Sequence, residues 1–272
     1  MKLNHLTSFA NVAPGATATV LVPLGPTYER FVFNLGGTTF TTANITQIRC
    51  RINGKLCYII NGSDLLKVNA YYGLYTSGTN QLTLDFSEIF ARDQVGQSIG
   101  AIATSYGIQT FQMEVDINAA AVAPTLDCYA VTSPPRAAQY DAQGRPILVI
   151  EKLLQYQASF AAAGKFTLPV PFGANGSVIK RVYFFHNNIG ALEIKKNGLI
   201  VHEGPLAVLQ QIQLENRKVP QAGLLVYDAV VDNNMNQMLP TTDASAFEIN
   251  VTLTAGDTIR YLVEYIDPLG NL

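Results

Sequence analysis

One pattern occurs twice in the chain, first as Gln47-Ile-Arg-Cys-Arg-Ile-Asn-Gly-Lys-Leu-Cys-Tyr-Ile-Ile60 and again as Ala191-Leu-Glu-Ile-Lys-Lys-Asn-Gly-Leu-Ile-Val-His202. Each copy is an alternating run, then Asn-Gly, then a second alternating run. This is the strongest short-range signal for a β-hairpin closed by a type I′ turn. The turns Asn53-Gly54 and Asn197-Gly198 lie 144 residues apart in a chain of 272, so the repeat is close to half of the molecule.

Other landmarks return in the same order. Val22-Pro-Leu-Gly25 reappears as Val170-Pro-Phe-Gly173, and Phe111-Gln-Met-Glu-Val-Asp-Ile117 is echoed by Phe247-Glu-Ile-Asn-Val-Thr-Leu253. A period this long indicates two related domains rather than a solenoid, whose repeats run to roughly 20–50 residues. We predict a first domain over residues 1–132, a linker over 133–146 that is rich in proline and glycine, and a second domain over 147–272.

The composition indicates a protein with little freely solvated surface. Charged residues make up 14% of the chain, against roughly 25% in an ordinary soluble domain. A stable assembly that covers much of each subunit would explain this. The net charge of −2 comes without a basic stripe, which disfavours direct binding of nucleic acid. The long uncharged stretches are interrupted by polar residues, prolines or glycines, so we expect no membrane-spanning helix. The first nine residues have no long apolar run and no obvious cleavage site, so we expect no signal peptide.

The periodicity predicts eight short strands in each half, with one short helix after the fourth. Strands are expected near residues 16–22, 28–35, 45–52, 55–60, 81–86, 98–104, 108–118 and 124–131, and again near 165–170, 178–186, 191–196, 199–202, 223–227, 235–239, 245–254 and 257–266. The helices are expected after Ser63, as N-cap, and over 205–215. The segment 147–163 fits a helix or a strand equally well.

These elements predict an all-β protein made of two tandem eight-stranded jelly rolls. An immunoglobulin-type sandwich is the main rival. It lacks a helix between the fourth and fifth strands and usually carries a core tryptophan, and this chain has no tryptophan. The double jelly roll is therefore the predicted fold.

Three cysteines do not form a disulfide scaffold. Counting outward from the Asn53-Gly54 turn pairs Cys50 with Cys57, and the repeat puts Ile194 and Val201 in their places. These apolar counterparts favour two buried thiols that behave as small hydrophobic residues. The same counting predicts that His202 faces Glu193.

Three segments also resemble a known family. They are the opening Leu3–Tyr28, the Asn-Gly hairpin with its following helix, and Phe111–Leu126. Together they are similar to corticovirus-type double jelly-roll major capsid proteins of tailless, membrane-containing icosahedral bacteriophages. The likeness is clearest over the first 130 residues and rests on turn and strand motifs.

The resemblance implies a major capsid protein of the virion, made and assembled in the host cytoplasm. It implies a homotrimer that forms a pseudo-hexameric capsomer and tiles an icosahedral shell over an internal lipid membrane. Neighbouring capsomers, a penton protein and membrane-associated virion proteins would be its partners, and its contact with the membrane would be only indirect or peripheral. No cofactor is required, calcium is possible by resemblance only, and the metal ligands are unknown because no dense Asp/Asn loop is present.

An enzyme is the less favoured reading. A bicupin metalloenzyme needs closely spaced histidines, whereas His5, His186 and His202 are scattered. Two carboxylate pairs could suit a glycosidase, namely Asp85 with Glu88 and Glu114 with Asp116, but the second pair also suits the solvent face of a strand. Without a catalytic motif we expect no enzyme, and we assign no catalytic or cofactor-binding residues.

The other alternative is a glycan- or receptor-binding module, such as a virion spike or a lectin. Tyr71, Tyr72 and Tyr75 form the densest tyrosine cluster and could serve as stacking platforms. They fit equally well as contacts at a helix end or a subunit interface, where tyrosine is favoured. The loops 36–44 and 232–242 are candidates for an exposed tower or for contacts between capsomers.

Overall fold

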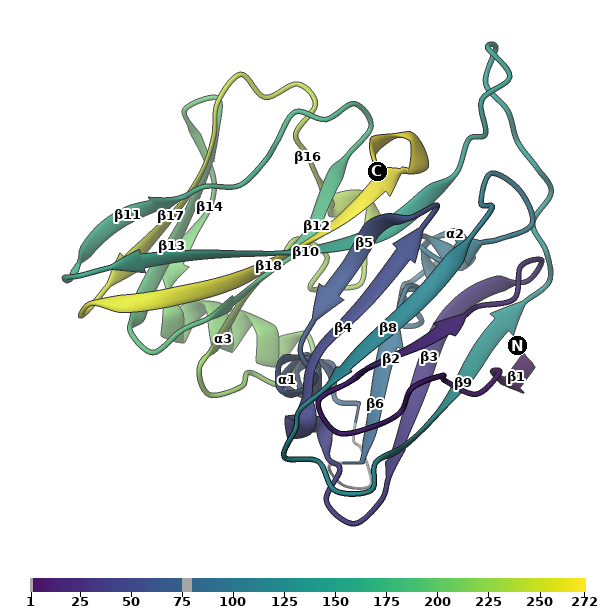
Figure 1. Ribbon diagram of the computed structural model, residues 1–272. Helices are drawn as coiled ribbons and strands as arrows, with labels where there is room; N and C mark the ends of the chain where they lie inside the picture. Colours follow the sequence, from purple (N-terminus) through teal and green to yellow (C-terminus); the bar gives the residue numbers. More distant parts are fainter. Residues whose placement is uncertain (1, 75–79) are drawn as a thin grey trace.

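The computed structural model describes residues 2–74 and 80–272 and shows two β-barrels side by side (Figure 1). The strands of the first are β1 (Lys2–His5), β2 (Thr17–Leu21), β3 (Thr27–Gly36), β4 (Ile45–Ile52), β5 (Lys55–Ile60), β6 (Gln81–Asp85), β7 (Ile102–Ala103), β8 (Phe111–Ile117) and β9 (Thr125–Ser133). Those of the second are β10 (Val149–Phe160), β11 (Gly164–Leu168), β12 (Val178–Phe185), β13 (Ile189–Lys196), β14 (Leu199–Pro205), β15 (Leu224–Asp228), β16 (Leu239–Pro240), β17 (Phe247–Leu253) and β18 (Asp257–Pro268). The helices are α1 (Gly62–Tyr71), α2 (Gln94–Ser98) and α3 (Leu206–Glu215), with 3₁₀ turns η1 (Thr42–Asn44), η2 (Met235–Gln237) and η3 (Leu269–Asn271).

The strand order is the same in both halves. The first barrel pairs its strands as β1-β9-β3-β6 and β5-β4-β8-β2, and the second as β10-β18-β12-β15 and β11-β17-β13-β14. Each strand from β1 to β9 thus has a counterpart nine places later, and α1 corresponds to α3. The predicted all-β double jelly roll is confirmed. The domain boundaries stay a prediction.

Both Asn-Gly turns form as predicted. Asn53 and Gly54 have φ of 52° and 77°, and Asn197 and Gly198 have 53° and 78°, the positive values that a type I′ turn requires. Each asparagine side chain also accepts hydrogen bonds from backbone amides of a neighbouring loop. The duplication therefore extends to single hydrogen bonds.

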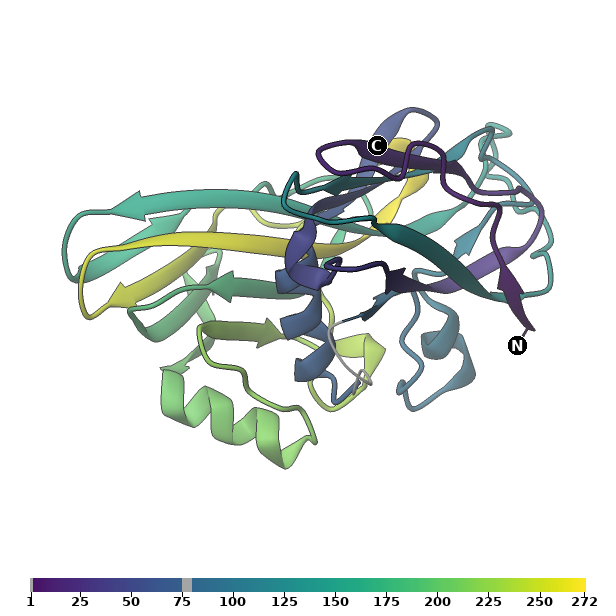
Figure 2. The same cartoon turned by 60° about the horizontal axis from the view of Figure 1, so that its bottom comes forward.

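The two barrels are packed against each other. Figure 2 shows α1 between the barrels and α3 on the outer side of the second. Strand β10 touches β5 in parallel at Leu153 and Tyr58, which joins sheets of both barrels into one of nine strands. Side chains of the second barrel, including Tyr183, Phe185 and Leu262, are buried in the hydrophobic cluster of the first.

Several local predictions were wrong. The strand β1 was not predicted, because its four residues are all exposed and carry no apolar alternation. The segment 98–104 is mostly not a strand, since Asp93 caps α2 by accepting from Gly96 N at 2.7 Å and leaves only β7. Asn61, rather than Ser63, caps α1. The weak strand expected near 235–239 is the turn η2 followed by β16.

The ambiguous segment 147–163 contains the strand β10, which pairs along its whole length with β18. Of the two loops considered for outward contacts, 232–242 touches the first half of the chain. Arg92 Nη2 lies 3.1 Å from Asp232 Oδ2, and Met235 is buried beside Ala91. No helix among residues 2–74 and 80–272 is both long and apolar enough to cross a membrane.

A β-bulge next to each turn changes the predicted cross-strand pairs. Cys50 lies opposite Tyr58 rather than Cys57, although Cys57 Sγ still approaches the Cys50 carbonyl oxygen at 3.2 Å. His202 likewise lies opposite Ile194 rather than Glu193. The extra residue of a bulge shifts every pair beyond it. Both thiols of the first hairpin are free and buried, as expected.

Candidate functional site

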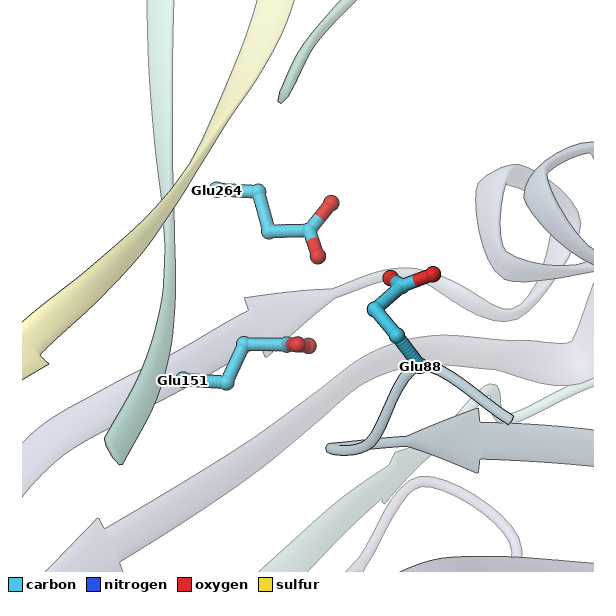
Figure 3. Close-up of side chains that lie close together, drawn as sticks. All are labelled: Glu88, Glu151 and Glu264. Atoms are coloured by element: carbon cyan, nitrogen blue, oxygen red, sulfur yellow. The ribbon is translucent and has the colours of Figure 1, made fainter. Parts of the chain in front are cut away.

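Three glutamates meet in the interior between the barrels. Glu88 follows β6 of the first barrel, whereas Glu151 lies on β10 and Glu264 on β18 of the second. Their carboxyl groups point toward one another (Figure 3), and one oxygen of each lies within 4.8 Å of the others. All three residues are buried, so uncompensated negative charge here would be very costly.

Two adjacent cations of β12 neutralise the glutamates. The ammonium of Lys180 contacts all three carboxylates, with Glu88 Oε1 at 3.0 Å. The guanidinium of Arg181 contacts both carboxylate oxygens of Glu88 and lies 3.5 Å from Glu264 Oε1. A bulge between Ile179 and Arg181 interrupts the regular alternation of β12, which lets two consecutive side chains serve the same face of the sheet.

Arg181 also forms an ion pair that occurs in both barrels. Its Nε lies 2.8 Å from Asp228 Oδ1, on the neighbouring strand β15. At the corresponding place in the first barrel, Arg30 Nε lies 2.8 Å from Asp85 Oδ1. Only the second barrel's arginine receives a further carboxylate, that of Glu88, from the other barrel. The duplicated pair has thus become a link between the domains.

Tyrosines complete the network. Tyr71 Oη donates to Asp228 Oδ2 at 3.0 Å, and Tyr183 Oη donates to Glu264 Oε2 at 2.7 Å. Since the Tyr183 proton is used for Glu264, Tyr72 is the donor in its hydrogen bond with Tyr183. Tyr71 and Tyr72 stand at the end of α1, so they connect the first barrel to the second. Tyr75, the third member of the predicted cluster, lies outside the described residues.

The cluster shifts the pKa values of its carboxyl groups in opposite directions. Burial by itself raises the pKa of every glutamate here, but the charges of Arg181 and Lys180 outweigh it for Glu88 and Glu264, whose pKa values are lowered. For Glu151 burial wins, and its pKa is raised well above the usual value. Burial lowers the pKa of Lys180, but the three glutamates more than offset this and raise it. The lysine therefore stays charged.

The three-glutamate group does not fit a metal ion. Calcium takes six to eight oxygen ligands at about 2.3–2.6 Å, and here the Lys180 ammonium contacts each of the carboxylates that would supply them. The residues present form a buried salt-bridge cluster in which the Lys180 ammonium occupies the place that a metal cation would need. Bound calcium, which only the resemblance makes possible, is not tested by this structure, and this group does not fit it.

The cluster is also unsuited to turning over a substrate. The adjoining cavity, lined by Glu88, Glu151 and Glu264, measures about 30 Å³, which is room for about one or two waters and far too small for a sugar. Asn69 and Ser87 line the same cavity and each carry a buried polar atom with no protein partner. The geometry supports a structural role.

The structure separates the other residues considered for chemistry. His5 lies near Asp127, His186 Nδ1 accepts from Ile189 N, and His202 packs on the Tyr227 ring. Glu114 and Asp116 both bind Arg49, at 2.7 and 2.6 Å, so they form a cross-strand ion-pair network. Of the two carboxylates Asp85 and Glu88, only Glu88 belongs to the interdomain cluster.

Sequence reasoning missed four residues of this cluster: Lys180, Arg181, Glu151 and Glu264. A signal was present, because Val178-Ile-Lys-Arg-Val-Tyr-Phe-Phe185 and Tyr261-Leu-Val-Glu-Tyr-Ile266 place opposite charges inside apolar strands. Charges in strands that are buried on both faces need partners. The sequence could have predicted the pairing but not its location between domains.

The pKa directions predict that the stability contributed by this group of buried carboxyls is greatest in mildly acidic solution. Glu88 and Glu264 have folded-state pKa values below the ordinary 4.5, so their stabilising contribution is present above pH 4.5 and is lost as the pH falls through the folded values. Glu151 and Asp85 act with the opposite sign, since burial raises their pKa values, that of Asp85 to about 6. Their protonation therefore adds stability as the pH falls toward 4.5.

Burial also lowers the pKa values of His186 and His202, which acts against stability as the pH falls below 6.5. The contribution of the cluster is therefore the difference between the unfolding midpoints of the wild type and of Glu88→Gln, measured from about pH 8 to about pH 3. The variant Glu88→Gln should flatten the fall of the midpoint at acidic pH. An unfolding midpoint that keeps rising below the ordinary glutamate pKa would contradict this assignment.

Two jelly rolls in tandem, fixed to each other by buried ion pairs, define a protein of the double jelly-roll class. The family described as viral coat protein P2, N-terminal domain, matches residues 3–133, and its C-terminal domain matches residues 150–269. The chain belongs to the viral coat protein P2 family. The resemblance to corticovirus-type double jelly-roll capsid proteins, predicted from the sequence, is confirmed.

Solved structures support the fold. The major capsid protein P2 from bacteriophage PM2 is 19% identical, with a TM-score of 0.85 over 98% of this chain and 97% of that one. The major capsid protein of Sulfolobus turreted icosahedral virus is 14% identical, with a TM-score of 0.74 over 99% of this chain and 97% of that one. A capsid structure of the virus PBCV-1 has 11% identity and a TM-score of 0.64, over 97% and 92%. No curated protein sequence matches this chain.

Proposed function

We propose that this coat protein is the main shell subunit of an icosahedral bacteriophage and acts as a homotrimer. Three chains in a closed ring have threefold symmetry, but each chain carries two barrels with one strand order. The ring then presents six similar barrels and can tile a hexagonal lattice as a pseudo-hexamer. The internal duplication is the observation that carries this proposal.

The buried cluster gives the proposed subunit a fixed shape. A subunit of a hexagonal lattice needs a constant angle between its two barrels, and a flexible linker alone would not fix that angle. Glu88 and the α1 tyrosines join the first barrel to Arg181, Asp228 and Tyr183 of the second. We infer that this network holds the barrels at the angle that the lattice requires.

The remaining partners follow from the same proposal. The shell encloses an internal lipid membrane, which this chain touches only indirectly or peripherally, and penton and membrane-associated virion proteins complete it. We propose no enzymatic role and no direct contact with nucleic acid. Two of the three tyrosines considered for glycan binding do not support that alternative, because Tyr71 is fully buried and the Tyr72 hydroxyl is bonded to Tyr183 between the barrels.

Native mass spectrometry of the purified protein, or of capsomers released from particles, tests the proposal. We expect a trimer, and negative-stain images of assembled protein should show pseudo-hexagonal plates or shells. A stable monomer at high concentration, or a dimer, would overturn the pseudo-hexamer. Binding of isolated monomers to a glycan array would favour the alternative instead.

A further inference from the structure

One face of the first barrel is covered within the chain, and the corresponding face of the second barrel is not. The segment β4–β5–α1 corresponds to β13–β14–α3 at a constant shift of 144 residues. In the first barrel, β5 and α1 face the second barrel (Figure 2). In the second, β14 is the edge of its four-stranded sheet and α3 lies on the outside.

The covered face shows how such a surface is used. Leu153 of β10 pairs in parallel with Tyr58 of β5. On α1, Asp64 is 4% exposed and receives Arg260 of β18 at 2.6 Å, while Val68 is 7% exposed. One edge strand and the adjoining sheet of the second barrel thus cover both β5 and α1.

The uncovered surface of the second barrel carries several exposed apolar residues, although a surface that faces solvent is usually polar. We define the α3/β14 face by its exposed apolar residues: Leu199 (72% exposed), Ile200 (49%), Val201 (45%), Val208 (50%), Ile212 (42%) and Leu214 (54%). Val208 and Ile212 occupy the positions of Asp64 and Val68. An exposed apolar patch joined to an unpaired strand edge marks an interaction surface.

The matching surface on another copy can be identified strand by strand. Strand β10 corresponds to β1, which is the edge of its sheet and pairs only with β9 among the described residues. Leu3 of β1 lies opposite Val131, which lies opposite Arg30. Leu153 lies opposite Glu264, which lies opposite Arg181. Since Arg30 corresponds to Arg181, Leu3 corresponds to Leu153.

Leu3 and Leu153 differ in burial because only Leu153 has a neighbouring strand on that side within the chain. Leu153 is 2% exposed against β5, whereas Leu3 is 62% exposed in the single chain. Leu153 pairs with Tyr58 of β5. The residue of β14 that corresponds to Tyr58 is His202, since Tyr58 lies opposite Cys50 in the first hairpin and His202 lies opposite Ile194 in the second. The two unpaired edges thus carry matching positions.

We propose that the α3/β14 face binds the first barrel of a second copy of this chain. Strand β1 of that copy lies parallel to β14, with Leu3 opposite His202, and the outer side of its β1-β9-β3-β6 sheet covers α3. The two surfaces lie at opposite ends of the molecule (Figures 1 and 2). The contact is therefore head-to-tail, and such contacts form rings when the rotation closes. This inference rests on the proposed trimer and specifies its interface.

The contact should be less apolar than the one within the chain. Tyr183 and Phe185 line the outer side of β12 and are buried against the first barrel, while the corresponding residues of β3 are Val32 and Asn34. A more polar surface on one side suits subunits that fold separately and associate later.

A pair of cysteines tests the register. The double variant Leu3→Cys/His202→Cys should give a covalent trimer on a denaturing gel after mild oxidation, because directly opposed strand residues have the Cα separation that a disulfide needs. The wild type should stay monomeric on that gel, since all three native thiols are buried, and each single variant, with one new thiol per chain, should give no covalent trimer.

A charge substitution tests the face independently. Ile212→Asp should dissociate the trimer in native mass spectrometry, while Val122→Asp, on the β8–β9 connection with a similar exposure of 50%, should leave it intact. Circular dichroism of both variants checks that they fold.

The outcomes separate this inference from the function on which it rests. A wild-type trimer without the Leu3–His202 cross-link, and with Ile212→Asp still trimeric, would overturn the interface and leave the pseudo-hexamer standing. A wild-type protein that never forms trimers would overturn the proposed function itself.

Discussion

Replacing Lys180 with methionine is expected to lower the free energy of unfolding by about 3–5 kcal/mol, the usual cost of removing one partner from a buried ion pair. Methionine fills a similar volume, so packing changes little. The loss arises because Glu88, Glu151 and Glu264 keep their burial but lose the ammonium that all three contact. Denaturant unfolding at neutral pH measures it.

The control is the same substitution at an exposed ion pair. Lys165 Nζ lies 2.8 Å from Glu193 Oε1 and its side chain is 50% exposed, so Lys165→Met should cost at most about 1 kcal/mol. The Lys180→Met loss should also shrink at acidic pH, because protonated glutamates no longer need the ammonium. Equal losses in the two variants, or a loss independent of pH, would show that Lys180 is not the counter-ion of this cluster.

Arg181→Met is expected to cost a similar amount, about 3–5 kcal/mol, and to loosen the junction between the barrels. Arg181 is fully buried and binds Glu88 of the first barrel together with Asp228 of its own. Its removal leaves charges unpaired on both sides of the junction. Unfolding followed by tyrosine fluorescence, with limited proteolysis of the connection between the barrels, measures both effects.

The corresponding arginine of the first barrel provides a matched control. Arg30 makes the same ion pair with Asp85, but their side chains are 19% and 25% exposed and no carboxylate reaches Arg30 from the other barrel. Arg30→Met should therefore cost less than Arg181→Met, because it unpairs one carboxylate of its own barrel and none of the other, and it should leave the junction as resistant to protease as before. A double-mutant cycle of Arg181→Met with Glu88→Gln should show a coupling of about 0.5–3 kcal/mol. Additive losses would mean that Arg181 does not link the barrels through Glu88.

Most of the architecture was predictable because it depends on local patterns. The Asn-Gly turns need only two residues that tolerate positive φ, and the alternation on either side sets which face is buried. The repetition of these signals in order then indicated two domains of one fold. Errors occurred where one extra residue shifts the strand register, as at the bulges that place Cys50 opposite Tyr58 and His202 opposite Ile194.

The sequence by itself determined that this protein is a duplicated jelly roll, since strand periodicity and turn residues are properties of neighbouring residues. Only the tertiary structure decided that Glu88 meets Lys180 and Arg181, which are 92 and 93 residues away in the sequence. Glu88 lies in a connection with no periodic pattern, and its partners lie on another domain. Their meeting depends on how the barrels pack, and the cost of burying charge then requires each of these groups to find its counter-ion.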